Sequence, residues 1–483
     1  MDELDLLVIG GGITGAGVAR LAARNGFRVA LLDRGDLMSG TSSVSSHMLH
    51  GGLRYLEHLR LGLVGESLGE RAAVSRMAPA LVQPRRFLVP LYRGGRLAPW
   101  KLRLGLQLYD WLAGRRGLAP HAMLRPREAL ALEPDLAPEG LLGAGLYSDV
   151  VMDDGRIGIA VARDAADHGA AIHTYTEVTG ARPGGATLEV LARDRLGGGE
   201  RSFHTRTLVV AAGPWADAVR AMLTRSLTPG APEPPALLRP SRGVHLVYPA
   251  LTRSHALLLT ARADGRVFFV VPFSDRALVG TTEVEVSSPP PADAWRASPE
   301  EVRYLRAELR RALPGVAGTA PLAVFAGVRP LVASQAEVGR ASREHHVLEQ
   351  HPIYTVIGGK YTTFRVMARD ALAPIARRLR RGDDRLADPE APLPMPLGAG
   401  RAPDAIAEHA VAREFARRLE DVLRRRSALW LAPDRGRVAA TVVARVMGEK
   451  LGWSEERRRE EIQAYESALF EEDALLDRAR EDA

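Results

Sequence analysis

The first 33 residues hold the feature that most limits what this chain can fold into. The stretch DLLVIG (Asp5–Gly10) predicts a short buried strand, and RVALLD (Arg28–Asp33) predicts a second. Between them, Thr14–Asn25 predicts a helix rich in alanine and glycine. Two apolar strands joined by one helix are typical of a parallel βαβ unit. We therefore expect a parallel α/β sheet that begins near the N-terminus.

Three glycines at the turn between the first strand and the helix predict a nucleotide site. Gly10, Gly12 and Gly15 form the pattern G-x-G-x-x-G, and Asp33 ends the second strand 18 residues after Gly15. Glycine allows the tight turn and lets the backbone approach a pyrophosphate, whose charge faces the helix N-terminus. An acid at the end of the second strand accepts hydrogen bonds from ribose hydroxyls. The segment therefore predicts a dinucleotide site.

Later segments indicate that this site is assembled from distant parts of the chain. AAGPWAD (Ala211–Asp217) follows a buried strand, and IGGKYTT (Ile357–Thr363) opens a helix. Between Arg242 and Glu283, four β-type runs separated by turn residues predict an antiparallel sheet. A site built from three distant segments suits FAD, a long dinucleotide held across a whole domain. In this arrangement the chain resembles the flavoprotein oxidoreductases in which an FAD-binding domain is interleaved with an antiparallel substrate domain. The fold class expected is therefore α/β, a Rossmann-type FAD-binding domain interleaved with an antiparallel β-sheet substrate domain, plus a C-terminal helical domain.

These patterns divide the chain into six consecutive segments. The FAD-binding domain is expected from residues 1–95, 145–235 and 340–384, and the substrate domain from residues 96–144 and 236–339. The helical C-terminal domain is expected from residues 385–483. Proline and glycine cluster in Asp388–Asp404, which predicts a linker, and Ala405–Ala483 predicts helix throughout.

Composition narrows the class of protein. The 483 residues include no cysteine, which excludes disulfides, iron–sulfur clusters and a flavin linked through cysteine, and no metal site is expected. The acidic N-terminus lacks the basic region of a signal peptide, and no apolar run reaches the length of a membrane span. The net charge of +7 permits attraction to phosphorylated substrates or anionic lipid. Basic runs such as Arg424–Arg426 are expected on charged helices without aromatics, which argues against nucleic-acid binding.

One stretch, SSVSSHMLHGGLRYLEH (Ser42–His58), combines residue types that ordinary surface or core does not need. Its hydroxyls and backbone amides can bind pyrophosphate and ribityl oxygens without adding charge. Its glycine pair allows close backbone approach to a flat ring. His50, Arg54 and Tyr55 then offer a titratable group, a fixed cation and a phenol. The stretch predicts the wall of a cofactor and substrate pocket.

Motifs in a fixed order carry a more specific signal. They are GGGITGAG, TSSVSSHMLHGGLRYLE, YSDVVMDDGRI, VVAAGPWAD, GVRPL and IGGKYTTFR, followed near the C-terminus by AREFARRLEDVLRRRSAL and MGEKLGW. In these motifs the chain resembles the FAD-dependent (aerobic, quinone-linked) glycerol-3-phosphate dehydrogenases. The resemblance implies oxidation of sn-glycerol 3-phosphate at C2 to dihydroxyacetone phosphate. It also implies hydride transfer to non-covalently bound FAD and transfer of the electrons to a membrane quinone.

The resemblance also implies how the substrate is held. Arg54 and Arg329 are expected to anchor the phosphate, with Tyr55 assisting, because arginine binds a phosphate bidentately with a fixed charge. Arg329 is counted among the catalytic residues as well. The remaining residues expected in the substrate pocket are His245, Thr281, Thr282 and Arg343.

Oxidation of an alcohol requires removal of its hydroxyl proton, and imidazole titrates near working pH. His50 is the first candidate for this base, ahead of His245, which could equally be a hydrogen-bonded core histidine. Lys360, expected at a helix N-terminus, is a candidate for supporting developing alkoxide or reduced flavin.

The residues expected to bind FAD all lie in the motifs named above or in the segments between them. They are Gly10, Gly12, Ile13, Thr14, Gly15, Asp33, Thr41, Ser42, Ser43, Ser46, His50, Gly51, Gly52, Val178, Ala212, Gly213, Trp215, Gly358, Gly359, Lys360, Tyr361 and Thr362.

The chain departs from the family pattern in three places. His47 stands where the family usually has lysine, which questions any role for that lysine near the flavin. Glu283 replaces the usual aspartate, a mild change. The C-terminal helical domain is expected to be short, which bears on oligomer contacts and leaves a homodimer as one option.

Membrane attachment is expected from a segment rich in aromatic and basic residues. PWKLRLGLQLYDWLAGRR (Pro99–Arg116) suits a helix lying in the bilayer interface, and the alternative is a helix packed on the substrate domain. Because a quinone acceptor requires access to lipid, we expect a cytoplasmic protein bound peripherally to the inner leaflet of the cytoplasmic membrane.

Rival functions remain at this stage. A flavin amine oxidase of the sarcosine or glycine oxidase type would share the interleaved architecture, and an oxygen-using glycerophosphate oxidase would share the substrate. From another class, the chain could be a flavin-binding interaction protein without catalysis. That protein would bind FAD but would not reduce it with any polyol phosphate.

Overall fold

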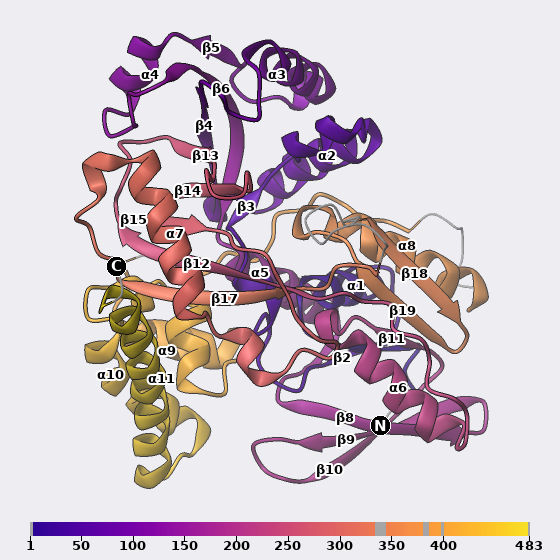
Figure 1. The fold of residues 1–483 in the computed structure, drawn as a ribbon. Coiled ribbons are helices and arrows are strands. Elements are labelled where there is room, and N and C mark those ends of the chain that lie inside the picture. The colour runs from indigo at the N-terminus through magenta and orange to yellow at the C-terminus, as the bar shows by residue number, and fades with distance from the viewer. Residues whose placement is uncertain (1–2, 334–343, 380–385, 398–399, 482–483) are drawn as a thin grey trace.

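A six-stranded, mainly parallel sheet carries the nucleotide-binding part of the chain (Figure 1). The computed structural model describes residues 3–333, 344–379, 386–397 and 400–481. The strand order is β18–β19–β11–β1–β2–β7, and β18 is the antiparallel member at one edge. The strands are β1 (Leu6–Ile9), β2 (Val29–Leu32), β7 (Ala171–His173), β11 (Leu208–Val210), β18 (His345–Gln350) and β19 (Ile353–Gly358).

Strand alternation explains why this sheet is covered on both faces. In β1, Leu6 and Val8 pack into the cluster around α1, whereas Leu7 and Ile9 pack into a cluster on the opposite face. The first face is covered by α1 (Ile13–Arg24), α5 (Asp154–Asp167) and α8 (Phe364–Arg378). The second face is covered by α6 (Ala216–Leu227) and by a three-stranded sheet, β8 (Thr176–Gly184), β9 (Thr187–Asp194) and β10 (Glu200–Thr205).

The second large sheet has ten strands, and most of its neighbouring strands are antiparallel. Its members are β3 (Met48–Leu49), β4 (Val82–Tyr92), β5 (Ala122–Leu124), β6 (Leu141–Met152), β12 (Ser241–Pro249), β13 (Ala256–Thr260), β14 (Val267–Phe273), β15 (Arg276–Gly280), β16 (Val284–Glu285) and β17 (Ala323–Arg329). The predicted α/β fold with an interleaved antiparallel sheet is confirmed. The domain boundaries stay predictions, since β4 and β6 pair in this sheet although most of each lies in segments assigned to FAD binding.

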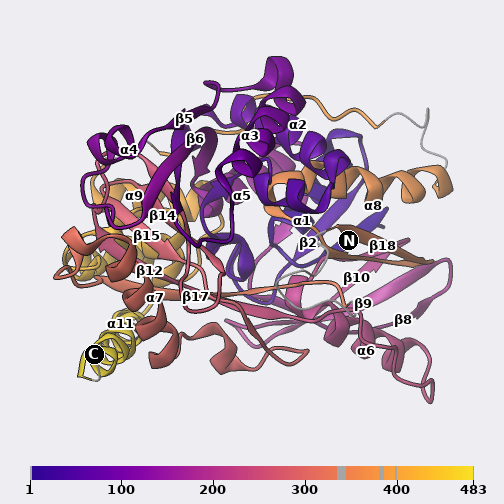
Figure 2. The same ribbon diagram turned by 45° about the horizontal axis from the view of Figure 1, so that its top comes forward.

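Helices outside the two sheets flank the antiparallel part. They are α2 (Leu61–Met77), α3 (Pro99–Ala113), α4 (Pro126–Leu132) and α7 (Pro299–Ala312). Figure 2 shows α2 and α3 side by side at the outer edge of the molecule.

Helix α3 has two apolar faces. Leu102, Leu106 and Tyr109 are buried against the sheet, whereas Trp100 and Trp111 are 65% and 73% exposed. One face of α3 is therefore packed on the substrate sheet, as the alternative to membrane binding predicts, and the other face is exposed. Tyr109 lies on the packed face. In the described parts of the chain, no helix has the length and apolarity needed to cross a bilayer.

The C-terminal domain consists of α9 (Pro403–Arg413), α10 (Arg437–Leu451) and α11 (Glu455–Glu481), shown in yellow in Figure 1. The prediction of helix throughout is wrong between α9 and α10, where the chain turns repeatedly. The basic run Arg424–Arg426, expected on a charged helix without aromatics, lies on and just after the short helix Asp421–Arg425, and the guanidinium of Arg424 is 5.8 Å from the centre of the Tyr465 ring. Arg425 and Arg426 are buried and bind the buried carboxylate of Asp36 at 2.6 and 2.5 Å, because this segment packs against the nucleotide-binding sheet.

The expected linker is also anchored to the nucleotide-binding domain. Asp388 pairs with Arg20 of α1 at 3.0 Å and with Arg365 of α8 at 2.9 Å. Leu393 joins the core cluster that contains α1 and α5. The segment around Asp388–Leu393 is therefore packed on the nucleotide-binding domain.

Glu414, at the end of α9, ties the C-terminal domain to α5. Its carboxylate receives two hydrogen bonds from Arg156, at 2.7 and 2.9 Å, and lies 3.4 Å from His409. Burial alone would raise the pKa of Glu414, but His409 and Arg156 lower it to about 2. The ion pair therefore stabilises the fold wherever Glu414 is ionised.

We expect Glu414→Gln to lower the free energy of unfolding by about 3 kcal/mol at neutral pH. Because the folded pKa lies below the unfolded one, this stabilisation is fully present above about pH 4.5 and is lost as the pH falls toward about 2. Urea unfolding at a series of pH values measures it. The exposed Glu420, replaced in the same way, is the control, and equal losses in both variants would contradict the role of Glu414.

Candidate active site

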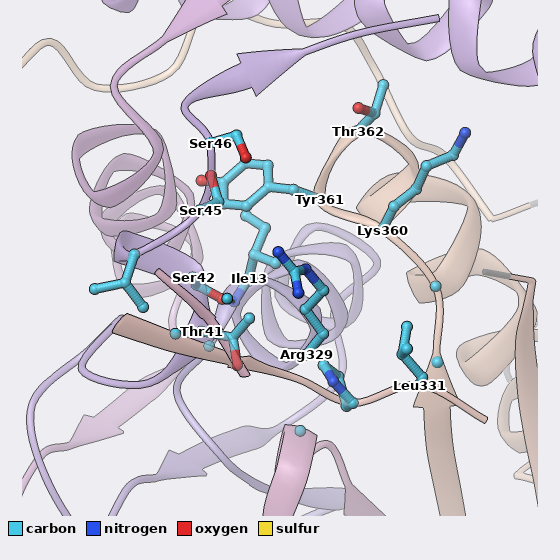
Figure 3. Close-up of a pocket in the computed structure, with 18 of the residues that line it drawn as sticks. Ile13, Thr41, Ser42, Ser45, Ser46, Arg329, Leu331, Lys360, Tyr361 and Thr362 are labelled. Carbon is cyan, nitrogen blue, oxygen red and sulfur yellow. Dashed lines mark hydrogen bonds between the residues drawn. The ribbon is translucent and has the colours of Figure 1, made fainter. Parts of the chain in front are cut away.

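One cavity of about 2100 Å³ runs between the two large sheets and receives side chains from both (Figure 3). Ligand pockets usually measure about 300–1,000 Å³, so this one has room for a dinucleotide and a substrate together. Its wall includes the turn after β1 and the end of β2. It also includes Arg54 and Tyr55, Arg329 at the end of β17, and Lys360.

The glycine turn after β1 fits a pyrophosphate. A Cβ at Gly15 would overlap the carbonyl oxygen of Gly10, so this close approach of helix and turn requires glycine. Gly12 lines the cavity, and the amide of Ile13 at the start of α1 donates to Ser42 Oγ at 3.0 Å. The first amides of α1 and the Ser42 hydroxyl thus form one polar surface at the positive end of the helix dipole.

Asp33 borders the cavity at the end of β2, as the sequence predicts. Its carboxylate accepts hydrogen bonds from the amides of Gly11 at 2.5 Å and Gly35 at 2.7 Å. Burial raises the pKa of Asp33, and these two amides oppose the shift. Two carboxylate oxygens held in place at this position suit the ribose hydroxyls of a dinucleotide.

The Ser/Thr loop crosses β17 where that strand carries Gly327. A Cβ at Gly327 would overlap Val44 of the loop, and Thr41 Oγ1 donates to the carbonyl of Val328 at 2.5 Å. Gly243 pairs with Gly327 in the adjacent strand β12. The loop therefore lies directly on the substrate sheet and presents its hydroxyls to the cavity.

The Arg329 guanidinium is held at the edge of the cavity by neighbouring polar groups. It donates to Thr281 Oγ1 at 2.6 Å and to the carbonyl of Thr282 at 3.3 Å. A Cβ at Gly243 would overlap the guanidinium, so glycine at that position leaves the space in which it lies. Figure 3 shows Arg329 on one side of the cavity and the Lys360–Thr362 turn on another.

Lys360 lies just before the helical turn that leads into α8, and two contacts fix its ammonium. It donates to Ser67 Oγ of α2 and lies 4.6 Å from the centre of the Tyr55 ring. A cation over an aromatic face is attracted by the ring quadrupole. A positive charge and a phenol thus lie together at the cavity wall.

His245 of β12 is buried and lines the cavity. Its Nε2 lies 2.9 Å from Ser46 Oγ, and its ring stacks on Phe325 of β17 with 5.1 Å between centres. Burial lowers the pKa of His245 well below the ordinary value, and the charge of Arg329 and the His47 ring lower it further. Its imidazole is therefore neutral at physiological pH and a weak acceptor of a further proton.

A buried network fixes the backbone next to His50. The Gly51 amide donates to Tyr109 Oη at 3.0 Å and Tyr109 donates to Asp149 at 2.9 Å. Asp149 in turn pairs with Arg71 of α2 at 3.0 Å. Helices α2 and α3 and strand β6 thus position the turn that carries His50 to the cavity wall.

Most of the predicted site residues lie on the cavity wall. They are Gly10, Gly12, Ile13, Thr14, Asp33, Thr41, Ser42, Ser46, His50, Gly52, Arg54, Tyr55, Val178, Ala212, Gly213, Trp215, His245, Thr281, Arg329, Gly358, Gly359, Lys360, Tyr361 and Thr362.

Four predicted residues lie behind the wall instead. Thr282 donates to the carboxylate of Glu301, and Ser43 donates to the carbonyl of Met38. Gly15 and Gly51 pack against protein backbone or side chains, as described above. Arg343 falls outside the described residues.

The histidine at position 47 is buried away from the cavity wall. It lies 3.3 Å from the carboxylate of Asp154, and its ring is 4.3 Å from that of Phe273. The change from the lysine usual in the family is therefore absorbed within the protein core.

Several wall residues were not predicted. Asp149, Tyr175 and Arg418 come from three separate segments. The aspartate stands in the quoted motif YSDVVMDDGRI, which was the available signal for it. For Tyr175 and Arg418 no local pattern marks the residue, because only the tertiary packing brings it to the cavity.

The fold and the cavity define a class of protein, and comparison with known families agrees. The family described as FAD dependent oxidoreductase matches residues 5–365, and the C-terminal domain of alpha-glycerophosphate oxidase matches residues 399–458. The chain therefore belongs to the FAD-dependent oxidoreductases, and FAD is its cofactor.

Within that class, relatives of known name indicate a narrower family. Glycerol-3-phosphate dehydrogenase of Mycobacterium leprae is 33% identical over 542 residues, and the alignment covers 100% of this chain and 90% of that protein. The chain thus belongs to the FAD-dependent glycerol-3-phosphate dehydrogenase family, and the resemblance seen in its motifs is confirmed.

Solved structures agree on the fold. Glycerol-3-phosphate dehydrogenase from Bacillus halodurans, complexed with FAD, has a TM-score of 0.74 at 24% identity and covers 96% of this chain and 94% of its own. Glycine oxidase from Geobacillus kaustophilus has a TM-score of 0.60 at 22% identity and covers 82% of this chain and 100% of its own. The second match leaves part of this chain uncovered.

Proposed function

We propose that this protein oxidises sn-glycerol 3-phosphate at C2 to dihydroxyacetone phosphate and that its electrons pass to a membrane quinone. The observation that carries the proposal is that Arg329, Lys360 and His50 all line the FAD cavity. Two fixed positive charges suit a phosphate dianion, and a nearby imidazole suits removal of a hydroxyl proton. Bound FAD supplies the two-electron acceptor for this oxidation.

Arg329 and Arg54 hold the phosphate in this proposal. Arg329 is already oriented by Thr281, so little freedom is lost when it binds an anion. Arg54 is exposed at the cavity wall, where it meets a substrate that enters from solvent. Tyr55, beneath the Lys360 ammonium, adds a phenol at the same place.

The hydroxyl proton at C2 passes to His50. The alternative base, His245, is held neutral by burial and by the charge of Arg329, so it binds a proton weakly. It serves instead as a neutral hydrogen-bonding group beside Ser46. Lys360 stabilises the negative charge that develops on the substrate oxygen as the proton leaves.

The proposal is tested by adding sn-glycerol 3-phosphate to the purified yellow protein under anaerobic conditions. We expect the flavin absorbance band near its oxidised maximum to bleach with this ester and to stay unchanged with sarcosine or plain glycerol. Bleaching by sarcosine would favour the amine oxidase alternative. A fully loaded flavin that none of the three compounds bleaches would contradict the proposed oxidation.

The electron acceptor is tested in the second half of the same reaction. The reduced protein is mixed with either a soluble quinone analogue or oxygen, and recovery of the absorbance band is followed. We expect faster recovery with the quinone. Recovery with oxygen alone at the catalytic rate would identify a glycerophosphate oxidase.

A quinone acceptor would require contact with lipid, and we propose that the outer face of α3 provides it at the inner leaflet of the cytoplasmic membrane. Trp100, Leu104 and Trp111 are exposed on that face, and Lys101 and Arg103 are on the same helix. Trp100, Lys101 and Leu104 also border the cavity. An apolar face beside cations is typical of a helix that lies in a bilayer interface.

We expect Trp100→Glu to weaken binding to vesicles of anionic lipid by about ten- to a hundredfold, because burial of a large apolar side chain contributes roughly 1.5–3 kcal/mol. Co-sedimentation with the vesicles measures the change. Phe470→Glu is the matched control, since Phe470 is also exposed, at 72%, but lies on α11. Equal binding by wild type and the Trp100 variant would contradict the proposed surface.

A further inference from the structure

The cavity reaches the C-terminal domain at its adenosine end. Beyond Asp33, the wall is formed by Tyr175, Glu177 and Arg195 and includes Arg418, which lies in the segment between α9 and α10. Asp33 marks this end, because the acid at the end of the second strand receives the adenosine ribose in this fold. The wall of the FAD site therefore includes a residue from outside the nucleotide-binding sheet.

Buried contacts hold the C-terminal segment against this end. Asp36, three residues beyond Asp33, receives hydrogen bonds from Arg425 and from both terminal nitrogens of Arg426. The side chains of Asp36 and Arg426 are fully buried. The segment is thus attached to the very loop that carries the ribose-binding acid.

A second contact joins the segment to the cavity wall. Tyr175 donates its hydroxyl proton to Asp421 at 2.7 Å, and the other oxygen of Asp421 accepts the amides of Arg417 and Arg418 at 2.8 Å each. One carboxylate therefore places the backbone of Arg418 next to Tyr175.

The side chain of Arg418 is oriented by a neighbour on α11. Its Nε donates to Glu461 at 3.0 Å, and the side chain keeps 41% of its surface exposed. Asp421 therefore holds the backbone of Arg418, and Glu461 holds its side chain through Nε. The two contacts together keep the planar guanidinium at the cavity wall. Arg417, the preceding residue, is exposed and does not border the cavity.

We propose that Arg418 binds the adenosine half of FAD, so that the C-terminal domain acts in retaining the cofactor. A planar guanidinium is suited to stack on an adenine ring and to donate to ribose or phosphate oxygens. Asp36 and Asp421 hold Arg418 at this position through the segment they anchor. FAD can then leave only after its contact with Arg418 of the C-terminal domain is broken.

The experiment follows release of FAD from the holoenzyme by the rise of free flavin fluorescence after dilution. We expect Arg418→Ala to speed release by about tenfold, the size of a partly desolvated cation–π contact, and Arg418→Lys to have a smaller effect. Arg417→Ala is the matched control, because it removes the same charge one residue away, and its release rate is expected to equal that of the wild type.

Two outcomes would overturn the proposal. If Arg418→Ala is indistinguishable from Arg417→Ala, the guanidinium makes no contact with FAD. If Glu472→Gln, which weakens the pairing of α11 with Arg424 and Arg435 but keeps the Arg418–Glu461 pair, speeds release as much as Arg418→Ala, the effect belongs to domain packing. No substrate enters the measurement, so its failure is distinct from failure of the proposed oxidation.

Discussion

Replacement of His50 by alanine is expected to slow flavin reduction by sn-glycerol 3-phosphate about 10²- to 10⁴-fold, the usual contribution of a general base. In the wild type the rate should rise with pH as the imidazole loses its proton, and in the variant this rise should disappear. Stopped-flow reduction under anaerobic conditions, repeated across pH, measures both effects. FAD content should be unchanged.

His245→Asn is the matched comparison for this prediction. Asparagine keeps a hydrogen-bonding group near Ser46, and the wild-type imidazole is already neutral because burial lowers its pKa. We therefore expect a smaller loss and a preserved pH dependence. If the asparagine variant instead loses the rise with pH, the base is His245 and not His50.

The parts of this fold that sequence reasoning predicts are those encoded locally. Glycines, a helix and an acid within one βαβ unit occur in the order that a nucleotide site requires, so Gly10, Gly15 and Asp33 could be placed from sequence. Four strands of the antiparallel sheet, β12 to β15, were predictable for the same reason, since each carries its own run of β-type residues between turns.

Residues whose role depends on packing between distant segments could not be placed. Thr281 and Thr282 are neighbours, yet one binds Arg329 at the cavity and the other binds Glu301 behind it. Their sequence positions are equivalent, and only the course of the chain between β15 and β16 separates them.

The basic run Arg424–Arg426 shows that sequence reasoning also could not predict which charged residues are buried. In sequence, Arg425 and Arg426 resemble a solvated helix face, but a single buried carboxylate, Asp36, pairs with both. That carboxylate lies 389 residues from the first of them, so no local pattern could indicate it. A buried charge needs such a partner, because an unpaired one costs several kcal/mol.

Arg329→Met is expected to lower kcat/KM for sn-glycerol 3-phosphate by about 10²- to 10³-fold, because loss of one partner from a hydrogen-bonded charge pair costs about 2–5 kcal/mol. Arg329→Lys should recover only part of the loss, since lysine cannot donate to Thr281 and to a phosphate through one planar group. Steady-state kinetics with an artificial acceptor measure both variants.

The control for the lost charge is Arg182→Met, because Arg182 pairs with Glu189 on the exposed three-stranded sheet. It should leave kcat/KM unchanged. Free FAD and bound FAD are quantified in each preparation, so that a loss of cofactor is separated from a loss of substrate binding. Plain glycerol has no phosphate for Arg329 to bind, so reduction of the flavin by high concentrations of plain glycerol should be equally slow in wild type and variant. Normal saturation by the ester in Arg329→Met would assign the phosphate to Arg54 and Lys360 instead.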